Sequence, residues 1–209
     1  MAINTYATLK TAVANFVKRD ILTSVIPDFI ALAEADFNRK LRTRNQEKRE
    51  TFTLSTQYTD LITLTNDILE IRNIQLNTNP VAFLEYRTPF QLDQELPSNT
   101  VGRPIFFTLH GDSLEVKPIP DASYTAEMTL IAPFAALSDS NTTNWLLTNH
   151  PDIYLYGSLV STNGYIMNDE RMVLWKQLYE QAVADLNAQE KRARYSGSPL
   201  KARTSTGTP

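Results

Sequence analysis

The spacing of the hydrophobic residues changes twice along this chain, and these changes limit the folds that it can adopt. Up to about residue 49, and again after Asn144, apolar residues recur every three or four positions, which is typical of amphipathic helices. Between residues 50 and 138 they alternate with polar residues, which is typical of half-buried strands. The sequence therefore predicts an α+β fold in which both chain ends form a helical bundle and an antiparallel β unit is inserted between them.

Two helices are predicted before residue 49. The first follows Thr5, a residue type that caps helices well, and its apolar stripe comprises Tyr6, Leu9, Val13, Phe16 and Val17. Residues 21–26 could add a short turn. The second begins at Pro27 and Asp28, and its apolar stripe comprises Ile26, Ile30, Ala33, Phe37 and Leu41.

Strand and turn signals fill the middle of the chain. We expect strands over residues 51–54, 61–64, 70–76, 81–86, 104–110, 113–118 and 124–131. Gly111 and Asp112 separate two of them and suit a two-residue hairpin turn in which glycine takes a positive φ. Thr88 and Pro89 are expected to open a short helix that ends near Leu96.

The stretch from Asn144 to Gly157 marks the return to helical spacing. Pro151 suits the first position of a helix, Asn149 or His150 can cap it, and Asp152 lies in the first turn, where the helix dipole favours a negative charge. Residues 161–164 are Ser, Thr, Asn and Gly, four weak helix formers, so this helix is expected to end or kink there.

A final helix is predicted after Asn168, with Asp169 and Glu170 in its first turn. Its apolar stripe comprises Met172, Trp175, Tyr179, Ala182 and Leu186. Large aromatic residues recur on the predicted helical faces, and we expect them to anchor the helical core: Phe37, Trp145, Tyr154, Tyr156, Trp175 and Tyr179.

These patterns divide the chain into three parts. We expect a helical core of residues 1–49 and 139–192, an inserted β domain of residues 50–138, and a flexible carboxyl-terminal tail of residues 193–209. The tail is small, polar and basic, and such a composition cannot bury enough apolar surface to fold by itself. It is therefore expected to order on binding a partner.

Composition argues against enzymatic chemistry. The 209 residues include no cysteine, which excludes disulfides and thiolate metal sites and suits a reducing cytoplasm. The two histidines, His110 and His150, lie in no metal-ligand or triad pattern, and glycine-rich phosphate loops are absent. We predict no catalytic residue, no metal, no cofactor and no membrane span, and hence a soluble protein.

Charge is distributed unevenly along the chain. Residues 1–49 carry a net charge of +4, residues 50–190 carry −12 and residues 191–209 carry +5. Such asymmetry favours electrostatic pairing with a partner or with another copy of the chain, although solvated surface charge is an equal alternative. We expect Arg39, Lys40, Arg42 and Arg44 to contact an acidic surface of a neighbouring subunit, while cations at a helix end also complement the helix dipole.

Several stretches, in order and spacing, resemble the head-to-tail adaptor (connector) proteins of tailed bacteriophages. In the amino-terminal part they are residues 6–16, 26–35 and 38–44; further along they are Gly102-Arg103-Pro104, residues 111–114, Asn144-Trp145-Leu146-Leu147, His150-Pro151-Asp152, residues 154–157, and Asp169-Glu170-Arg171 ahead of Trp175. The resemblance rests on the ordered set of these stretches over roughly residues 4–190.

The resemblance implies a structural role in the virion neck. Such adaptors form a ring, usually of twelve copies, below the portal protein; they extend the DNA channel and offer a docking face to tail, nozzle or second adaptor proteins. It also implies assembly in the host bacterial cytoplasm, non-specific proximity to double-stranded DNA, no membrane contact and no catalytic residue. The carboxyl-terminal tail would bind the portal, through Arg194, Tyr195, Leu200, Lys201 and Arg203.

Two other classes of function stay open at this point. One is a tail-side interaction protein, such as a tail terminator or a nozzle subunit. The other is a tail-associated hydrolase, against which the missing catalytic motifs argue.

Overall fold

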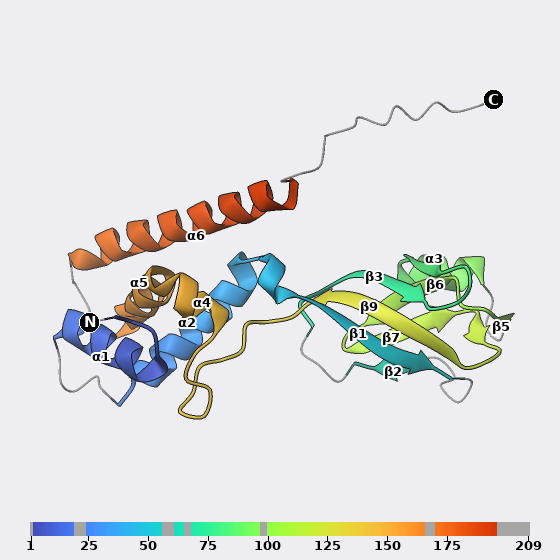
Figure 1. Cartoon of the computed structure of the whole chain (residues 1–209), viewed down its shortest axis with the longest axis horizontal. Coiled ribbons are helices and arrows are strands. Elements are labelled where there is room, and N and C mark those ends of the chain that lie inside the picture. The colour runs from blue at the N-terminus through green and yellow to red at the C-terminus, as the bar shows by residue number, and fades with distance from the viewer. Residues whose placement is uncertain are drawn as a thin grey trace. The chain divides into compact units, whose positions relative to one another are not determined.

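The chain divides into two compact units in the computed structural model, which describes residues 2–18, 24–55, 61–64, 68–96, 100–165 and 170–195 (Figure 1). Residues 1–44 together with residues 134–209 form the helical unit, and Asn45–Pro133 form the β unit. Both boundaries lie five residues before the predicted ones. The first strand starts early, at Glu47, because its charged and exposed beginning hides the alternation that marks a strand.

The first two helices begin and end close to their predicted bounds. Helix α1 (Tyr6–Val17) starts with a capping box, in which the Thr5 hydroxyl accepts a hydrogen bond from the Thr8 amide. Its predicted stripe is buried except for Phe16, which is 41% exposed because it lies at the edge of the face centred on Val13 and Val17. Helix α2 (Ile26–Lys40) buries its stripe, and Leu41 just beyond its end is also buried. The extra turn expected at 21–26 falls largely outside the described residues.

The return to helical structure takes two helices where the sequence predicted one. Helix α4 (Trp145–Asn149) is capped by Asn144, whose side-chain oxygen accepts from the Leu147 amide at 2.9 Å. Helix α5 (Pro151–Ser161) follows, with Pro151 and Asp152 placed as expected. Of the two predicted caps, His150 occupies the N-cap position of α5, although its side chain makes no capping hydrogen bond; the Asn149 side-chain amide donates to the Trp145 carbonyl instead.

The last helix is longer than predicted. Helix α5 ends at Ser161 and passes into the 3-10 turn Thr162–Gly164, as the weak helix formers indicated. Helix α6 runs from Arg171 to Tyr195, so residues 193–195, which the prediction placed in the tail, are helical. Good helix formers and cations that complement the helix dipole explain the extension. The predicted cap, Asn168, lies outside the described residues.

Aromatic side chains occupy the centre of the helical unit. Phe37 on α2 contacts Tyr154 on α5 edge to face, with 5.0 Å between ring centroids, and Tyr179 on α6 at 6.1 Å. These three residues are buried, as is Trp175. Trp145 and Tyr156 are half-buried against the same core, and Trp145 stacks on Phe134.

A buried polar network ties the connector 134–144 to this core. Glu34 on α2 accepts hydrogen bonds from the Leu137 amide at 2.8 Å and from the Tyr154 hydroxyl at 3.0 Å. Asn144 donates to the Tyr154 hydroxyl oxygen and to the Ala135 carbonyl. Burial raises the pKa of the Glu34 carboxyl above its ordinary value, although both hydrogen bonds favour the ionised form.

The β unit contains a seven-stranded sheet with the order β1-β9-β3-β4-β6-β7-β2. Its strands are β1 (Glu47–Leu54), β2 (Leu61–Thr63), β3 (Glu70–Leu76), β4 (Ala82–Tyr86), β6 (Phe106–His110), β7 (Ser113–Lys117) and β9 (Tyr124–Ile131). Two further two-residue strands, β5 (Val101–Gly102) and β8 (Ile119–Pro120), pair with each other. Gly111 takes the predicted positive φ, 59°, in the β6–β7 turn.

The prediction of a wholly antiparallel β unit was wrong. Strands β4 and β6 are parallel, as are β5 and β8. The physical reason is the connection between β4 and β6, which includes helix α3 (Pro89–Glu95) and carries the chain back to its starting edge. The sheet buries its own core, which includes Leu54, Ile74, Leu114 and Leu130.

Candidate interaction surfaces

The carboxyl ends of α2 and α6 are tied together. Arg44, just beyond α2, donates from its amide and its Nε to Glu190 Oε2, at 2.9 and 3.2 Å. The Asn187 side chain donates to the Lys40 carbonyl at 3.2 Å. Because residues 187, 191 and 194 lie on one face of a helix, Lys191 and Arg194 follow this contact along α6.

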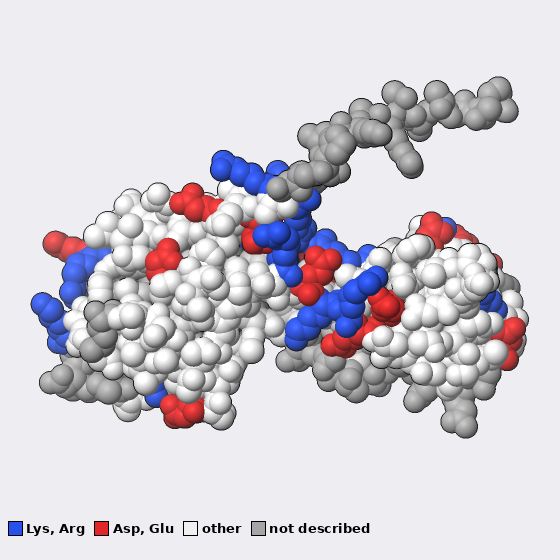
Figure 2. Space-filling model, viewed as in Figure 1, with Lys and Arg blue, Asp and Glu red and all other residues white. Residues whose placement is uncertain are grey.

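Cations gather where the two helix ends meet. We call this region the basic surface; it comprises Arg39, Lys40, Arg42, Arg44, Lys191 and Arg194. Figure 2 shows Lys and Arg side chains over the end of α6. Some of this charge complements the two helix dipoles. Two carboxylates on the same helix ends, Asp36 and Glu190, oppose six cations, so the surface can attract an anionic partner.

The predicted inter-subunit residues already make contacts within the chain. Asp36 is hydrogen-bonded by Lys40 Nζ at 2.6 Å, by the Tyr179 hydroxyl at 2.6 Å and by Arg39 at 3.1 Å. Partial burial opposes ionisation of Asp36, but these three donors together lower the pKa of its carboxyl. Arg42 donates to the carbonyls of Asn38 and Leu41, both at 2.7 Å.

These contacts leave part of the cationic surface available to a second partner. The Arg39 side chain is 68% exposed and that of Arg44 is 55% exposed. A guanidinium group has five N–H donors, more than these contacts use, so each of the two arginines can donate to an intrachain and an intermolecular acceptor at the same time.

Residues of the predicted portal-binding tail fall in two places. Arg194 and Tyr195 lie in α6, where Arg194 joins the basic surface. Leu200, Lys201 and Arg203 lie outside the described residues. Sequence reasoning treated Arg194 and the Arg39–Arg44 cluster as separate sites and did not select Lys191. Only the docking of α6 on α2, which links residues about 146 positions apart, brings them together.

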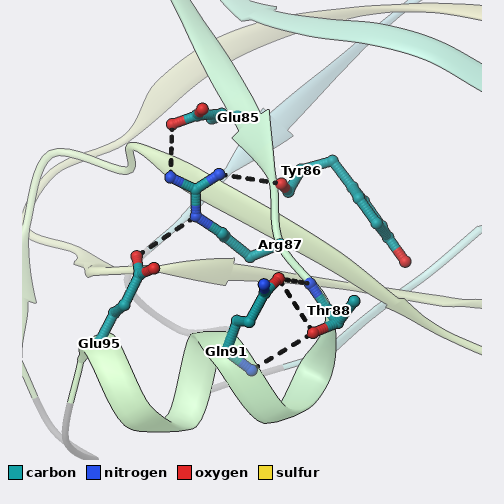
Figure 3. Close-up of polar contacts among 6 residues, drawn as sticks. All are labelled: Glu85, Tyr86, Arg87, Thr88, Gln91 and Glu95. Carbon is teal, nitrogen blue, oxygen red and sulfur yellow. Dashed lines mark hydrogen bonds and ion pairs between the residues drawn. The ribbon is translucent and has the colours of Figure 1, made fainter.

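An ion cluster joins β4 to α3 (Figure 3). Arg87 bonds Glu85 at 3.0 Å and Glu95 at 3.3 Å, and its guanidinium lies over the Phe106 ring at 4.9 Å. The hydrogen bond to Glu85, with help from Glu95, raises the pKa of Arg87. Beside it, Thr88 and Gln91 form the capping box of α3. The cluster fixes the helix against the strand, and sequence reasoning missed it because its members are spread over three elements.

The histidines take part in structural contacts. His110 Nε2 lies 2.7 Å from Glu115, which also contacts Lys117, and Lys117 in turn bonds Asp93 on α3. The His150 ring lies against Trp145 at 5.3 Å between centroids. Among the residues that the structure describes, no group of three or more His, Asp or Glu side chains is placed to hold a metal ion. No helix in the described part of the chain is long and apolar enough to cross a membrane.

Comparison with known proteins gives one clear result. No curated protein matches the chain. A family model described as SU10 adaptor protein matches residues 4–203, which span both the helical and the β unit. The match covers every stretch on which the resemblance to phage connector proteins rests. The chain therefore belongs to the SU10 adaptor protein family, a family of structural bacteriophage connector proteins of the virion neck rather than of enzymes.

Proposed function

We propose that this protein forms a ring, expected to contain twelve copies, that joins the phage portal to the tail and extends the DNA channel. It assembles in the host bacterial cytoplasm and binds the portal on one side and a tail, nozzle or second adaptor protein on the other. Double-stranded DNA passes through the ring without sequence readout. The observation that carries this proposal is the match of residues 4–203 to the adaptor family.

The charges of the two units support contacts between copies. The β unit holds twelve acidic and six basic side chains, a net charge of −6, while the helical unit holds eleven acidic and fourteen basic, a net charge of +3. The basic surface, with Arg39, Lys40, Arg42 and Arg44, therefore has a complementary partner on a neighbouring copy. A contact between two different surfaces of identical copies closes into a ring when its rotation permits.

Charge reversal tests this contact. Arg39→Glu with Lys191→Glu changes two exposed cations of the basic surface and leaves the Arg44–Glu190 bond in place. We expect at least tenfold weaker ring assembly on the purified portal of the same phage, measured by sedimentation and electron microscopy. Arg72→Glu with Arg103→Glu makes the same charge change on the β unit and serves as the control. Intact rings from the Arg39/Lys191 variant would contradict a role for the basic surface.

The carboxyl-terminal tail is proposed to capture the portal. Residues 196–209, with Leu200, Lys201 and Arg203, follow directly on α6, where Arg194 and Tyr195 lie. Deleting 196–209 is expected to abolish co-sedimentation with portal, while the helical unit still unfolds cooperatively. Co-sedimentation of the full chain with portal alone, without any tail protein, separates this role from that of a tail terminator or nozzle subunit. Unchanged capture after the deletion would show that another segment binds the portal.

A further inference from the structure

A groove opens between three helices of the helical unit. It has a volume of about 300 Å³ and is lined by residues of α2, α5 and α6. Its small and apolar lining residues include Ala33, Gly157 and Val160, and Leu32, which is 58% exposed, lies beside them. A water molecule occupies about 30 Å³ of the liquid, so the groove has room for one large apolar side chain.

Cations flank this groove. Arg39 and Lys40, which belong to the basic surface, line it from α2, and Lys176 lines it from α6. Two carboxylates also reach it, Asp36 and Glu180, and each lies near a lysine or arginine of the same helix. The groove therefore suits an apolar side chain that has acidic neighbours.

The β unit carries such side chains within one segment of its sequence. Among the described residues, its strongly exposed large apolar side chains all lie within residues 81–105: Val81, Phe83, Tyr86, Phe90, Val101 and Ile105. We call this segment the apolar edge. Phe90, in the first turn of α3, is 71% exposed, and Phe83 is 64% exposed. Large exposed apolar side chains that are concentrated in one segment make that segment a candidate for an interaction site.

Carboxylates accompany the apolar edge. Phe83 and Glu85 point to the same face of β4, because alternate residues of a strand share a face. Asp93 and Glu95 lie on α3 with Phe90, and Figure 3 shows Glu85 and Glu95 turned toward Arg87 at the end of β4. Within the chain, Glu85 and Glu95 pair with Arg87, and Asp93 pairs with Lys117, but the three carboxylate side chains are 60%, 45% and 73% exposed, so each can also face a cation of a second copy.

We propose that the groove of one copy receives the apolar edge of a second copy, with Phe90 entering beside Leu32. This inference rests on the proposed ring and names the two surfaces that form its subunit contact. Burying a phenyl ring removes roughly 150–250 Å² of surface from water, and the cations around the groove face the carboxylates of the edge. The groove lies on the helical unit and the apolar edge on the β unit, so each copy can bind one neighbour through its groove and the other neighbour through its edge. In a closed ring every groove and every edge is then occupied.

Cysteine crosslinking tests the contact, because the chain contains no cysteine of its own. Leu32→Cys and Phe90→Cys are made in separate full-length chains that carry different tags. The two proteins are mixed, assembled on purified portal and oxidised mildly. A heterodimer of the two tags must be intermolecular. The control replaces Leu32→Cys with Phe16→Cys, an exposed apolar position on α1 that does not line the groove.

The expected result is a disulfide-linked Leu32→Cys/Phe90→Cys heterodimer in about half of the ring-bound copies, the share that random mixing of equal amounts of the two variants allows in a ring, and at least tenfold less with Phe16→Cys. Homodimers of either variant in place of the heterodimer would indicate a symmetric contact and overturn the inference. Rings without the crosslink would also overturn it but leave the proposed function standing. If the wild-type chain forms no ring on portal, the proposed function fails and the inference fails with it.

Discussion

At the scale of single residues, Gly157 faces the ring of Phe37 in the helical core. A Cβ atom at this position would lie 2.7 and 2.8 Å from two ring carbons of Phe37. Alanine favours a helix by about 1 kcal/mol over glycine, but overpacking a core costs about 1–3 kcal/mol. Since Tyr154 and Tyr179 hold the Phe37 ring, we expect Gly157→Ala to destabilise the helical unit by about 1–2 kcal/mol.

Urea unfolding followed by tryptophan fluorescence measures this effect, because Trp145 and Trp175 both lie in the helical unit. The control is a double-mutant cycle with Phe37→Leu, which removes the ring atoms that the new methyl group meets. In the Phe37→Leu background, Gly157→Ala should lower the free energy of unfolding by less than it does in the wild type. An equal loss of stability in both backgrounds would show that contact between the new methyl group and the Phe37 ring does not cause the destabilisation.

Glu34 predicts a pH dependence of stability. Its folded-state pKa is raised by burial, so the stability that it contributes is fully present below about pH 4.5 and is lost as the pH rises through the raised value. Glu34→Gln cannot ionise. The stability of this variant relative to wild type should therefore be constant below about pH 4.5 and should increase above it, as measured by urea unfolding at a series of pH values.

Glu34→Ala is the matched control for this prediction. It removes the acceptor of the Leu137 amide and the Tyr154 hydroxyl, and two donors lose their partner in the core. We expect a loss of about 2–4 kcal/mol. A Glu34→Gln variant whose stability runs parallel to wild type across the whole pH range would contradict a raised pKa.

Residues with local roles could be predicted from the sequence, and those with distant partners could not. The caps at Thr5 and Thr88 and the positive φ of Gly111 depend on neighbours within a few positions, and all three were predicted. Glu34 meets the Leu137 amide 103 positions away. From its place on the predicted helix alone, Glu34 would be expected to be a solvated surface charge. Only the packing of the connector 134–144 against α2 shows that it is buried.

At the scale of elements, periodicity located most helices and strands but not how they are joined. Helix α4 was missed because five residues are too few to show a helical repeat. The parallel pairing of β4 with β6 was missed because a strand pattern does not reveal its direction or its neighbour. Helix α6 extends beyond its predicted end at residue 192 because the sequence has no glycine or proline before Tyr195 to terminate it.

The end of α6 depends on Glu190, and this gives a prediction for the whole element. Glu190 is buried and holds both the amide and the Nε of Arg44. Glu190→Ala leaves the Arg44 amide without this acceptor, at a cost of about 2 kcal/mol. Hydrogen exchange of amides in the last two turns of α6 should speed up about 30-fold, since 1.4 kcal/mol corresponds to a factor of ten in the local opening equilibrium.

Glu180→Ala provides the comparison on the same helix. Glu180 is exposed and lies 3.9 Å from Lys176, so its loss should change exchange by less than threefold. Equally slow exchange in the last two turns of the Glu190→Ala and Glu180→Ala variants would show that other contacts hold the end of α6 and that the basic surface does not depend on the Glu190–Arg44 bond.

At the scale of the whole molecule, the distribution of charge between the two folded units differs from its distribution along the chain. Along the chain, the −12 of residues 50–190 suggests a strongly acidic body between two basic ends. In the structure, part of that acidic stretch belongs to the helical unit, and the two basic ends lie in one unit with it. Six cations share one surface because α6 docks on α2, which no local pattern reveals.

The division into two units predicts that the helical unit folds without the β unit. The chain enters and leaves the β unit side by side, since the Ala132 amide donates to the Gln46 carbonyl at 2.8 Å and Glu47 pairs with Ile131. A linker of about six Gly and Ser residues can therefore replace residues 45–133. Shortening this connection from roughly 90 residues lowers the entropic cost of closing it by about 2 kcal/mol.

The shortened chain should unfold cooperatively by tryptophan fluorescence, at a urea midpoint no lower than that of the full chain's helical unit. It keeps the groove, the basic surface and the carboxyl-terminal tail but lacks the apolar edge. It should therefore co-sediment with portal and yet form no closed ring by electron microscopy, because no copy can fill its neighbour's groove. Closed rings of the shortened chain would place the subunit contact wholly within the helical unit, whereas loss of portal binding by a folded shortened chain would place portal capture in the β unit.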